Sequence, residues 1–161
     1  MKVNVDGAWD SESLNSGIGV IIRNHMGFSI AGASIHEKFN SAIEAEAAAV
    51  VKGLQLAAHL KLQQIILEGD CQEVISAMED PSVNPNWRIS PMIAMVAHLQ
   101  PLFRGIKWNW ISREANRVAD AAAKLAKLRL CSQDWANRPP TSLLSILRND
   151  GLPGPPSSLD C

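Results

Sequence analysis

The sequence predicts an α/β fold in which helices cover both faces of a five-stranded mixed sheet. Two observations lead to this prediction. Three segments with the period of β-strands follow one another at the start of the chain, and from residue 40 helical and strand periods alternate. Strands joined by short turns run antiparallel, whereas strands separated by helices run parallel, so the two parts together predict a mixed sheet.

The first three strands are expected at residues 3–8, 18–23 and 28–34. In the first of them, Val3 and Val5 alternate with polar residues, which is typical of a strand with one buried face. The connection "NHMG" between the second and third strands places a glycine in a turn and favours a hairpin.

A long amphipathic helix is expected from residue 40 to about residue 60, capped at its start by Asn40 or Ser41. Its apolar positions recur every three or four residues: Ile43, Ala47, Val50, Leu54 and Ala57. The compact β-branched run "QIILEGD", residues 64–70, follows as a buried fourth strand.

The remaining elements are a helix at 72–78, a helix at 91–103, a fifth strand at 106–112 and an alanine-rich helix at 116–128. Two prolines separate the first pair of helices. Trp108 and Trp110 share one face of the fifth strand, a pattern that indicates packing under a helix more often than base stacking.

Residues 1–130 are therefore predicted to form one domain, followed by a Pro-rich, partly disordered extension at 131–161. From Asn137 to the last residue the chain has five of its nine prolines. The centre of this extension, "TSLLSILR", has the pattern of a short docked helix, whereas the final residues have nothing with which to build a core.

Composition excludes several classes of protein. Of the 161 residues, 47% are hydrophobic and 19% are charged, which is ordinary for a globular protein. No apolar run approaches a membrane span, and the first strand lies at the very start of the sequence without a signal peptide, which predicts a compact protein or a domain of a longer chain. Three widely spaced cysteines predict reduced thiols in an intracellular compartment, nucleus or cytoplasm.

Carboxylates stand at the ends of the expected strands. Asp6 and Asp70 lie at strand ends, Asp120 lies early in the last helix, and Glu44 and Glu46 lie in the first half of the long helix. Acids that converge there would repel one another unless a hard cation such as Mg²⁺ or Mn²⁺ lay among them. Each acid also has a plain structural alternative: Asp6 precedes a turn-forming glycine, and Asp70 is placed to cap the next helix.

Four motifs together resemble the ribonuclease H type 1 family: "KVNVDGAW", "AEAAAVVKGLQLA", "IILEGDCQEVISAM" and "REANRVADAAAKLA". The likeness is greatest to its plant branch of reverse-transcriptase-associated and retroelement-derived domains, and it covers about residues 1–130. It implies the RNase H-like fold with strand order 3-2-1-4-5. It also implies endonucleolytic cleavage of the RNA strand of RNA–DNA hybrids with two Mg²⁺ ions, Mn²⁺ being possible.

The resemblance implies that Asp6, Glu46, Asp70 and Asp120 are both the catalytic residues and the metal ligands. Glu46 is preferred over Glu44 by the match of the Ala-Glu-Ala motif. Around a helix, Glu46 shares its edge with small residues and Glu44 shares its edge with polar ones, which supports the same choice.

Nucleic-acid contacts are expected from residues around the same face. The resemblance places Gln72 at a polar contact in or near the minor groove of the hybrid, where 2′-hydroxyls mark RNA. The remaining expected contacts are Gly7 and Ala8, small enough to admit a phosphate beside Asp6, and Asn15, Ser16, Arg113 and Asn116.

Two departures from the family pattern support an alternative function. No His occurs after His98, although many catalytic members carry one on the loop before the final Asp, and residues 81–100 hold one Arg and no Lys. The net charge is −1. These features favour a retroelement-derived nucleic-acid-binding module with little activity; an exonuclease or integrase on the same fold is a third, weaker alternative. The expected partner is an RNA–DNA hybrid or another nucleic acid, with no membrane, and the chain is expected to be a monomer or a domain of a longer polyprotein.

Overall fold

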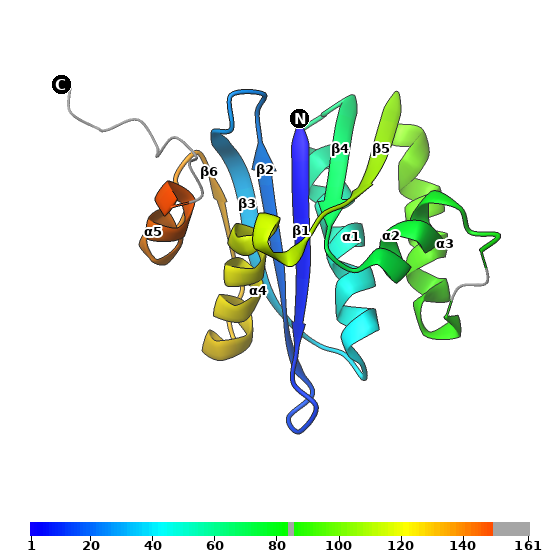
Figure 1. The fold of residues 1–161 in the computed structure, drawn as a ribbon, viewed down its shortest axis with the longest axis horizontal. Helices are drawn as coiled ribbons and strands as arrows, with labels where there is room; N and C mark the ends of the chain where they lie inside the picture. The colour runs from blue at the N-terminus through cyan, green and yellow to red at the C-terminus, as the bar shows by residue number, and fades with distance from the viewer. Residues whose placement is uncertain (84–85, 150–161) are drawn as a thin grey trace.

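The computed structural model describes residues 1–83 and 86–149. Six strands form one mixed sheet in the order β5-β4-β1-β2-β3-β6 (Figure 1). The strands are β1 (Lys2–Trp9), β2 (Asn15–Arg23), β3 (Ser29–Lys38), β4 (Gln64–Gly69), β5 (Gly105–Trp110) and β6 (Gln133–Ala136). The helices are α1 (Ala42–His59), α2 (Gln72–Glu79), α3 (Ser90–Leu99), α4 (Arg117–Arg129) and α5 (Thr141–Asn149), with short 3₁₀ turns at Trp87–Ile89, Gln100–Leu102 and Arg113–Ala115.

The predicted α/β fold, the mixed sheet and the order 3-2-1-4-5 of the first five strands are confirmed. β1, β2 and β3 pair antiparallel along their whole length, and β4 and β5 run parallel to β1. The pairing of β1 with β4 is short: it covers only Lys2–Asn4 of β1 and ends where Asn4 lies opposite Glu68. Beyond that pair β1 continues for five residues, while β4 ends at Gly69.

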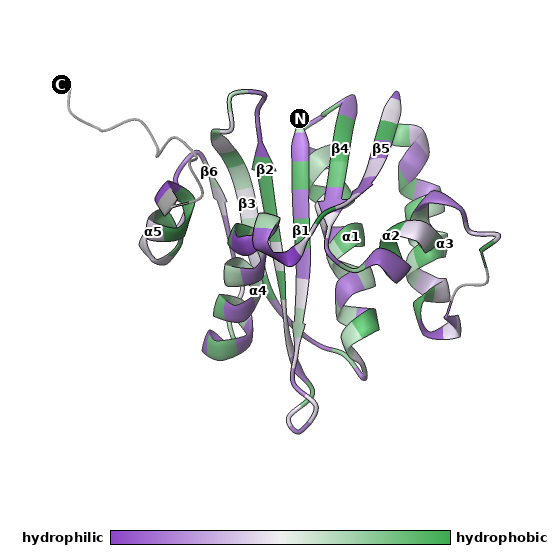
Figure 2. Ribbon diagram, viewed as in Figure 1, coloured by the Kyte–Doolittle hydropathy of each residue, from purple (hydrophilic) through white to green (hydrophobic). Residues whose placement is uncertain are grey.

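Helices cover both faces of the sheet. α1 packs on one face, where Gly53 lies against Val3 and Val5, and this face carries the main hydrophobic core (Figure 2). α4 packs on the other face, so closely that a Cβ on Gly19 of β2 would lie 2.0 Å from the backbone oxygen of Ala119. A glycine is needed there because any side chain would push α4, with Asp120 on it, away from the sheet.

The extension contributes more structure than the sequence predicted. The sheet has a sixth strand, β6, which pairs antiparallel with β3 from Ala31 to Ser34. The segment "QDWA" is too short for its period to be recognised, and only the exposed edge of β3 makes it a strand. The short helix expected in "TSLLSILR" is confirmed as α5, with Leu143 and Leu147 buried against α4 and β2. The division at residue 130 stays a prediction, and the expected disorder falls on residues 150–161, which lie outside the described residues.

Several predicted boundaries were wrong by a few residues. β2 begins at Asn15 instead of residue 18, and β3 ends at Lys38 instead of residue 34. The fifth strand ends at Trp110 instead of residue 112, and α3 ends at Leu99 with a 3₁₀ turn after it. Pro101 explains the early end of α3, because its ring and missing N–H interrupt the helical hydrogen bonds. Within residues 1–83 and 86–149, no helix has both the length and the apolar character that a membrane span requires.

Candidate active site

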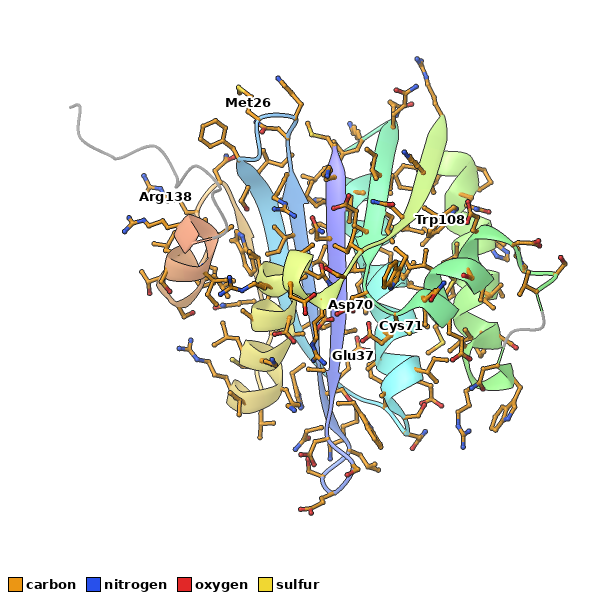
Figure 3. The ribbon with its side chains drawn as sticks, viewed as in Figure 1. Met26, Glu37, Asp70, Cys71, Trp108 and Arg138 are labelled. Atoms are coloured by element: carbon orange, nitrogen blue, oxygen red, sulfur yellow. The ribbon has the colours of Figure 1, made fainter. Side chains whose placement is uncertain are left out.

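Asp6, Glu46 and Asp70 come together from three separate elements. Each offers a carboxylate oxygen, and these three oxygens lie within 4.8 Å of one another. Asp6 lies on β1 two residues past its last pair with β4, Asp70 follows the end of β4, and Glu46 lies on α1. The sheet therefore opens between β1 and β4 at the point where the three side chains meet. In Figure 3, Asp70 lies beside β1 near the centre of the molecule, with Cys71 toward α2.

Glu46 is held in place by the strand it faces. The backbone N–H of Gly7 donates to Glu46 Oε2 at 3.2 Å. A Cβ on Gly7 would lie 2.5 Å from the backbone of Ala45 and Glu46. The close approach of β1 and α1 thus explains the small size of Gly7, and its expected contact with nucleic acid stays a prediction.

Glu44 has a different task, although it lies only two residues from Glu46. Its Oε2 accepts the backbone N–H of Asn40 at 2.9 Å, while its own N–H donates to Ser41 Oγ at 3.4 Å. Ser41 is the N-cap of α1, so Glu44 belongs to a capping arrangement at the start of the helix. Its carboxylate is used there and does not join the acidic cluster.

Asp120 lies in the first turn of α4, next to the cluster, and is paired with two cations. Its Oδ2 lies 2.7 Å from Lys124 Nζ and its Oδ1 lies 3.4 Å from Arg113 Nη2. The three-residue cluster does not include Asp120. Its charge is nevertheless felt there, because it raises the pKa of both Asp6 and Glu46.

The cluster is poorly compatible with full ionisation of its own acids. Burial, followed by the charges of Glu46, Asp70 and Asp120, raises the pKa of Asp6 to about 9. Burial and the charge of Asp70 raise the pKa of Glu46 to about 8, although the Gly7 N–H and Arg113 oppose this shift. A divalent cation would remove the penalty, and an all-carboxylate set fits hard ions such as Mg²⁺. The donors present therefore fit a divalent metal.

Asp70 is not the cap of the next helix. The N-cap of α2 is Cys71, and the backbone oxygen of Asp70 instead accepts the indole N–H of Trp110 at 3.0 Å. Trp108 packs against the main core as expected, whereas Trp110 is exposed because β5 ends there. Trp110 thus anchors the turn that carries Asp70, a contact that the sequence did not predict.

The expected nucleic-acid contacts divide by burial. Gln72, Arg113 and, in part, Ala8 and Asn15 are accessible, and Arg113 also contacts Asp120. Two predicted contacts were wrong, because Ser16 and Asn116 are fully buried. Ser16 Oγ donates to the backbone oxygen of Leu14, and Asn116 Nδ2 donates to the backbone oxygen of Val5 at 2.9 Å. Both side chains therefore form hydrogen bonds inside the protein.

Comparison with known proteins agrees with this geometry. A family model described as reverse transcriptase-like matches residues 4–126. The N-terminal RNase H domain of a Mycobacterium tuberculosis protein superimposes with a TM-score of 0.74 at 19% identity, covering 80% of this chain and 93% of the other. RNase H1 of the archaeon Halobacterium salinarum gives 0.71 at 22% identity, covering 81% and 100%.

A third solved structure, LC11-RNase H1 in complex with an RNA/DNA hybrid, gives a TM-score of 0.73 at 19% identity, covering 80% of this chain and 97% of the other. At these identities the likeness establishes the RNase H-like fold alone. No curated protein sequence matches this chain.

Proposed function

The chain belongs to the reverse transcriptase-like family, and from this premise we propose that it hydrolyses the RNA strand of RNA–DNA hybrids with two divalent ions. The observation that carries the proposal is the meeting of Asp6, Glu46 and Asp70 within 4.8 Å at the opening between β1 and β4. Structures of the same fold are RNase H1 enzymes, and one of them holds an RNA/DNA hybrid.

Asp6, Glu46, Asp70 and Asp120 would hold the ions, Mg²⁺ or Mn²⁺, through carboxylate oxygens alone. Two such ions activate a water and stabilise the leaving oxygen of a phosphodiester. The protein's part is to fix the ligands: Gly7 orients Glu46 through its N–H, and Trp110 holds the turn of Asp70. Asp120 would exchange its contacts with Arg113 and Lys124 for a metal ion, which frees Arg113 for a substrate phosphate.

Gln72 is proposed to contact the hybrid in or near its minor groove. It is exposed at the first position of α2, two residues after Asp70, so its amide extends from the same turn that carries a proposed metal ligand. An amide can both donate to and accept from the 2′-hydroxyl and base edges of a minor groove.

A labelled RNA–DNA hybrid incubated with Mg²⁺ tests the proposal. Asp70→Asn keeps the shape of the side chain and removes its charge, so we expect cleavage to fall more than about 100-fold, or about 2.7 kcal/mol. Glu44→Gln is the matched control: it removes one charge from the same helix as Glu46, away from the cluster, and should cleave like the wild type. Equal cleavage by the Asp70 variant, or none by the wild type at high enzyme concentration, would contradict the proposal.

The alternative of a binding module with little activity is supported by one feature of the site. Asp120 is paired with Lys124 and Arg113, and both contacts compete with metal ligation. A Mg²⁺ titration separates the two functions: a working site should bind the ion and raise the melting temperature by mass action, as the binding module alone would not.

A further inference from the structure

A buried polar network lies on the sheet directly beside the acidic cluster, and the proposed chemistry does not use it. Its centre is Glu68 of β4, only 4% exposed. Glu68 Oε2 accepts Asn4 Nδ2 at 3.0 Å, and Oε1 accepts Asn109 Nδ2 at 3.1 Å and lies 3.1 Å from Lys2 Nζ. Both carboxylate oxygens are thus occupied by donors from two neighbouring strands, β1 and β5.

The network extends from Asn4 to the start of α4. Asn4 Oδ1 accepts from Arg23 of β2, and Asn4 Nδ2 also lies 3.4 Å from Asn116 Oδ1. Asn116 in turn donates to the backbone oxygen of Val5 at 2.9 Å. Four strands and the start of α4 are therefore connected through the side chains of three asparagines, one arginine and one glutamate.

Three members of the network lie two or four residues before a proposed metal ligand in the sequence. Asn4 precedes Asp6 by two residues in β1, so their side chains share a face of the strand. Glu68 lies in β4, two residues before Asp70, which follows the end of that strand. Asn116 precedes Asp120 by four residues, and its backbone oxygen accepts the Asp120 N–H at 3.1 Å. The last pair between β1 and β4, Asn4 with Glu68, is also the last backbone link before the two strands part.

We propose that Glu68 and Asn4 are positioning residues that set the spacing of Asp6, Asp70 and Asp120 for divalent metal binding. The inference rests on the proposed function. Carboxylates that repel one another drift apart unless the strands that carry them are held at a fixed separation. Past the Asn4–Glu68 pair, β1 stays paired with β2 and β4 with β5, but no pairing between β1 and β4 fixes their separation. A buried network at that pair supplies the missing constraint, as hydrogen-bonding partners behind metal ligands do in general.

The test measures Mn²⁺ and Mg²⁺ affinity calorimetrically, well below the melting temperature of each protein. Glu68→Gln presents an amide N–H₂ to donors and breaks one side of the network; we expect the dissociation constant to rise about 10-fold. Asn109→Ala removes one hydrogen-bond donor on the edge strand β5 without changing the net charge, and we expect this variant to fold. It should raise the dissociation constant about 3-fold. Glu79→Gln, exposed on α2, is the charge-matched control and should bind like the wild type.

A second readout separates positioning from a merely structural role. The Mg²⁺ concentration for half-maximal cleavage should rise in both network variants, while KM for the hybrid at saturating Mg²⁺ stays unchanged. Wild-type affinity in folded Asn109→Ala, even with weaker binding by Glu68→Gln, would overturn the inference, since the effect would then be one of charge alone. Absence of ion binding in the wild type itself would instead refute the proposed function.

Discussion

At the scale of single residues, the acidic cluster is a place where buried charged side chains lower the stability of the metal-free protein. Asp6 is 3% exposed and faces three other acids, and its pKa of about 9 expresses that cost. Glu44 shows the reverse case, because a carboxylate two residues from Glu46 stabilises the start of α1. A carboxylate thus lowers stability at Asp6 and raises it at Glu44, because the groups around the two side chains differ.

Replacing Asp6 by Asn should stabilise the metal-free protein. The change removes a buried ionisable group while it keeps the side-chain shape, so we expect a gain of about 1–3 kcal/mol at pH 7 in EDTA. Thermal unfolding measures it as a rise of about 3–9 °C in melting temperature. Glu79→Gln removes a charge from an exposed site and should leave the temperature unchanged; a fall for Asp6→Asn would mean that this acid stabilises the fold.

The stability of the metal-free protein should fall as pH rises. The pKa values of Asp6 and Glu46 are raised in the folded state to about 9 and about 8, from ordinary values near 4. Between those limits the folded protein holds protons that the unfolded chain has released, so their contribution is complete at low pH and is lost as pH rises to 9. Urea unfolding in EDTA at pH 5, 7 and 9 measures the slope, and saturating Mg²⁺ should flatten it.

At the scale of elements, close packing against the sheet places the helices that carry the acids. Gly7 lets α1 approach β1, and Gly19 lets α4 approach β2. The sequence predicted α1 and α4 well because their apolar periods are long, but nothing in it indicated that Gly7 and Gly19 face helix backbones. The same limit explains Ser16 and Asn116: their polarity predicted surface contacts, whereas only the fold shows that partners inside the protein satisfy them.

Gly19→Ala should be strongly destabilising. Its Cβ would lie 2.0 Å from the Ala119 oxygen, so α4 must shift, and we expect a loss of about 2–3 kcal/mol in denaturant unfolding. Gly105→Ala is the matched control, because a Cβ there meets nothing within 4 Å. A loss in the control as large as in Gly19→Ala would show that strand glycines matter for their backbone alone.

At the scale of the whole molecule, residues 131–149 add a strand to the sheet and a helix that packs against it. β6 pairs with the free edge of β3, and α5 buries Leu143 and Leu147 beside Ile21 of β2. Sequence reasoning recognised α5 from its short apolar pattern, and from their motifs the three acids that the structure brings together, Asp6, Glu46 and Asp70. It missed β6, whose four residues form a strand only beside β3, and it missed the Glu68 network, whose signal was two polar residues on inward-facing positions of buried strands.

Leu147→Ala tests whether α5 is part of the folding unit. The side chain is 2% exposed, so its truncation should cost about 2–4 kcal/mol. Leu128→Ala on α4 is the control, because Leu128 is 77% exposed and its loss should cost less than about 0.5 kcal/mol. A single cooperative transition for both variants, with only the first shifted, would place α5 within the domain; no shift in either would place it outside.

The early end of the β1–β4 pairing has a consequence for the cohesion of the sheet. Past Asn4 and Glu68, the antiparallel half of the sheet (β1, β2, β3 and β6) is no longer paired with the parallel half (β4 and β5). The proposed metal ligands lie on both sides of this gap. An ion bound there would link the two halves of the sheet beyond the end of the β1–β4 pairing. Binding of the ion would therefore also stabilise the sheet against separation of its halves. We expect Mn²⁺ to slow amide hydrogen exchange in β1 between Val5 and Trp9, and hydrogen-exchange measurements with and without the ion test this.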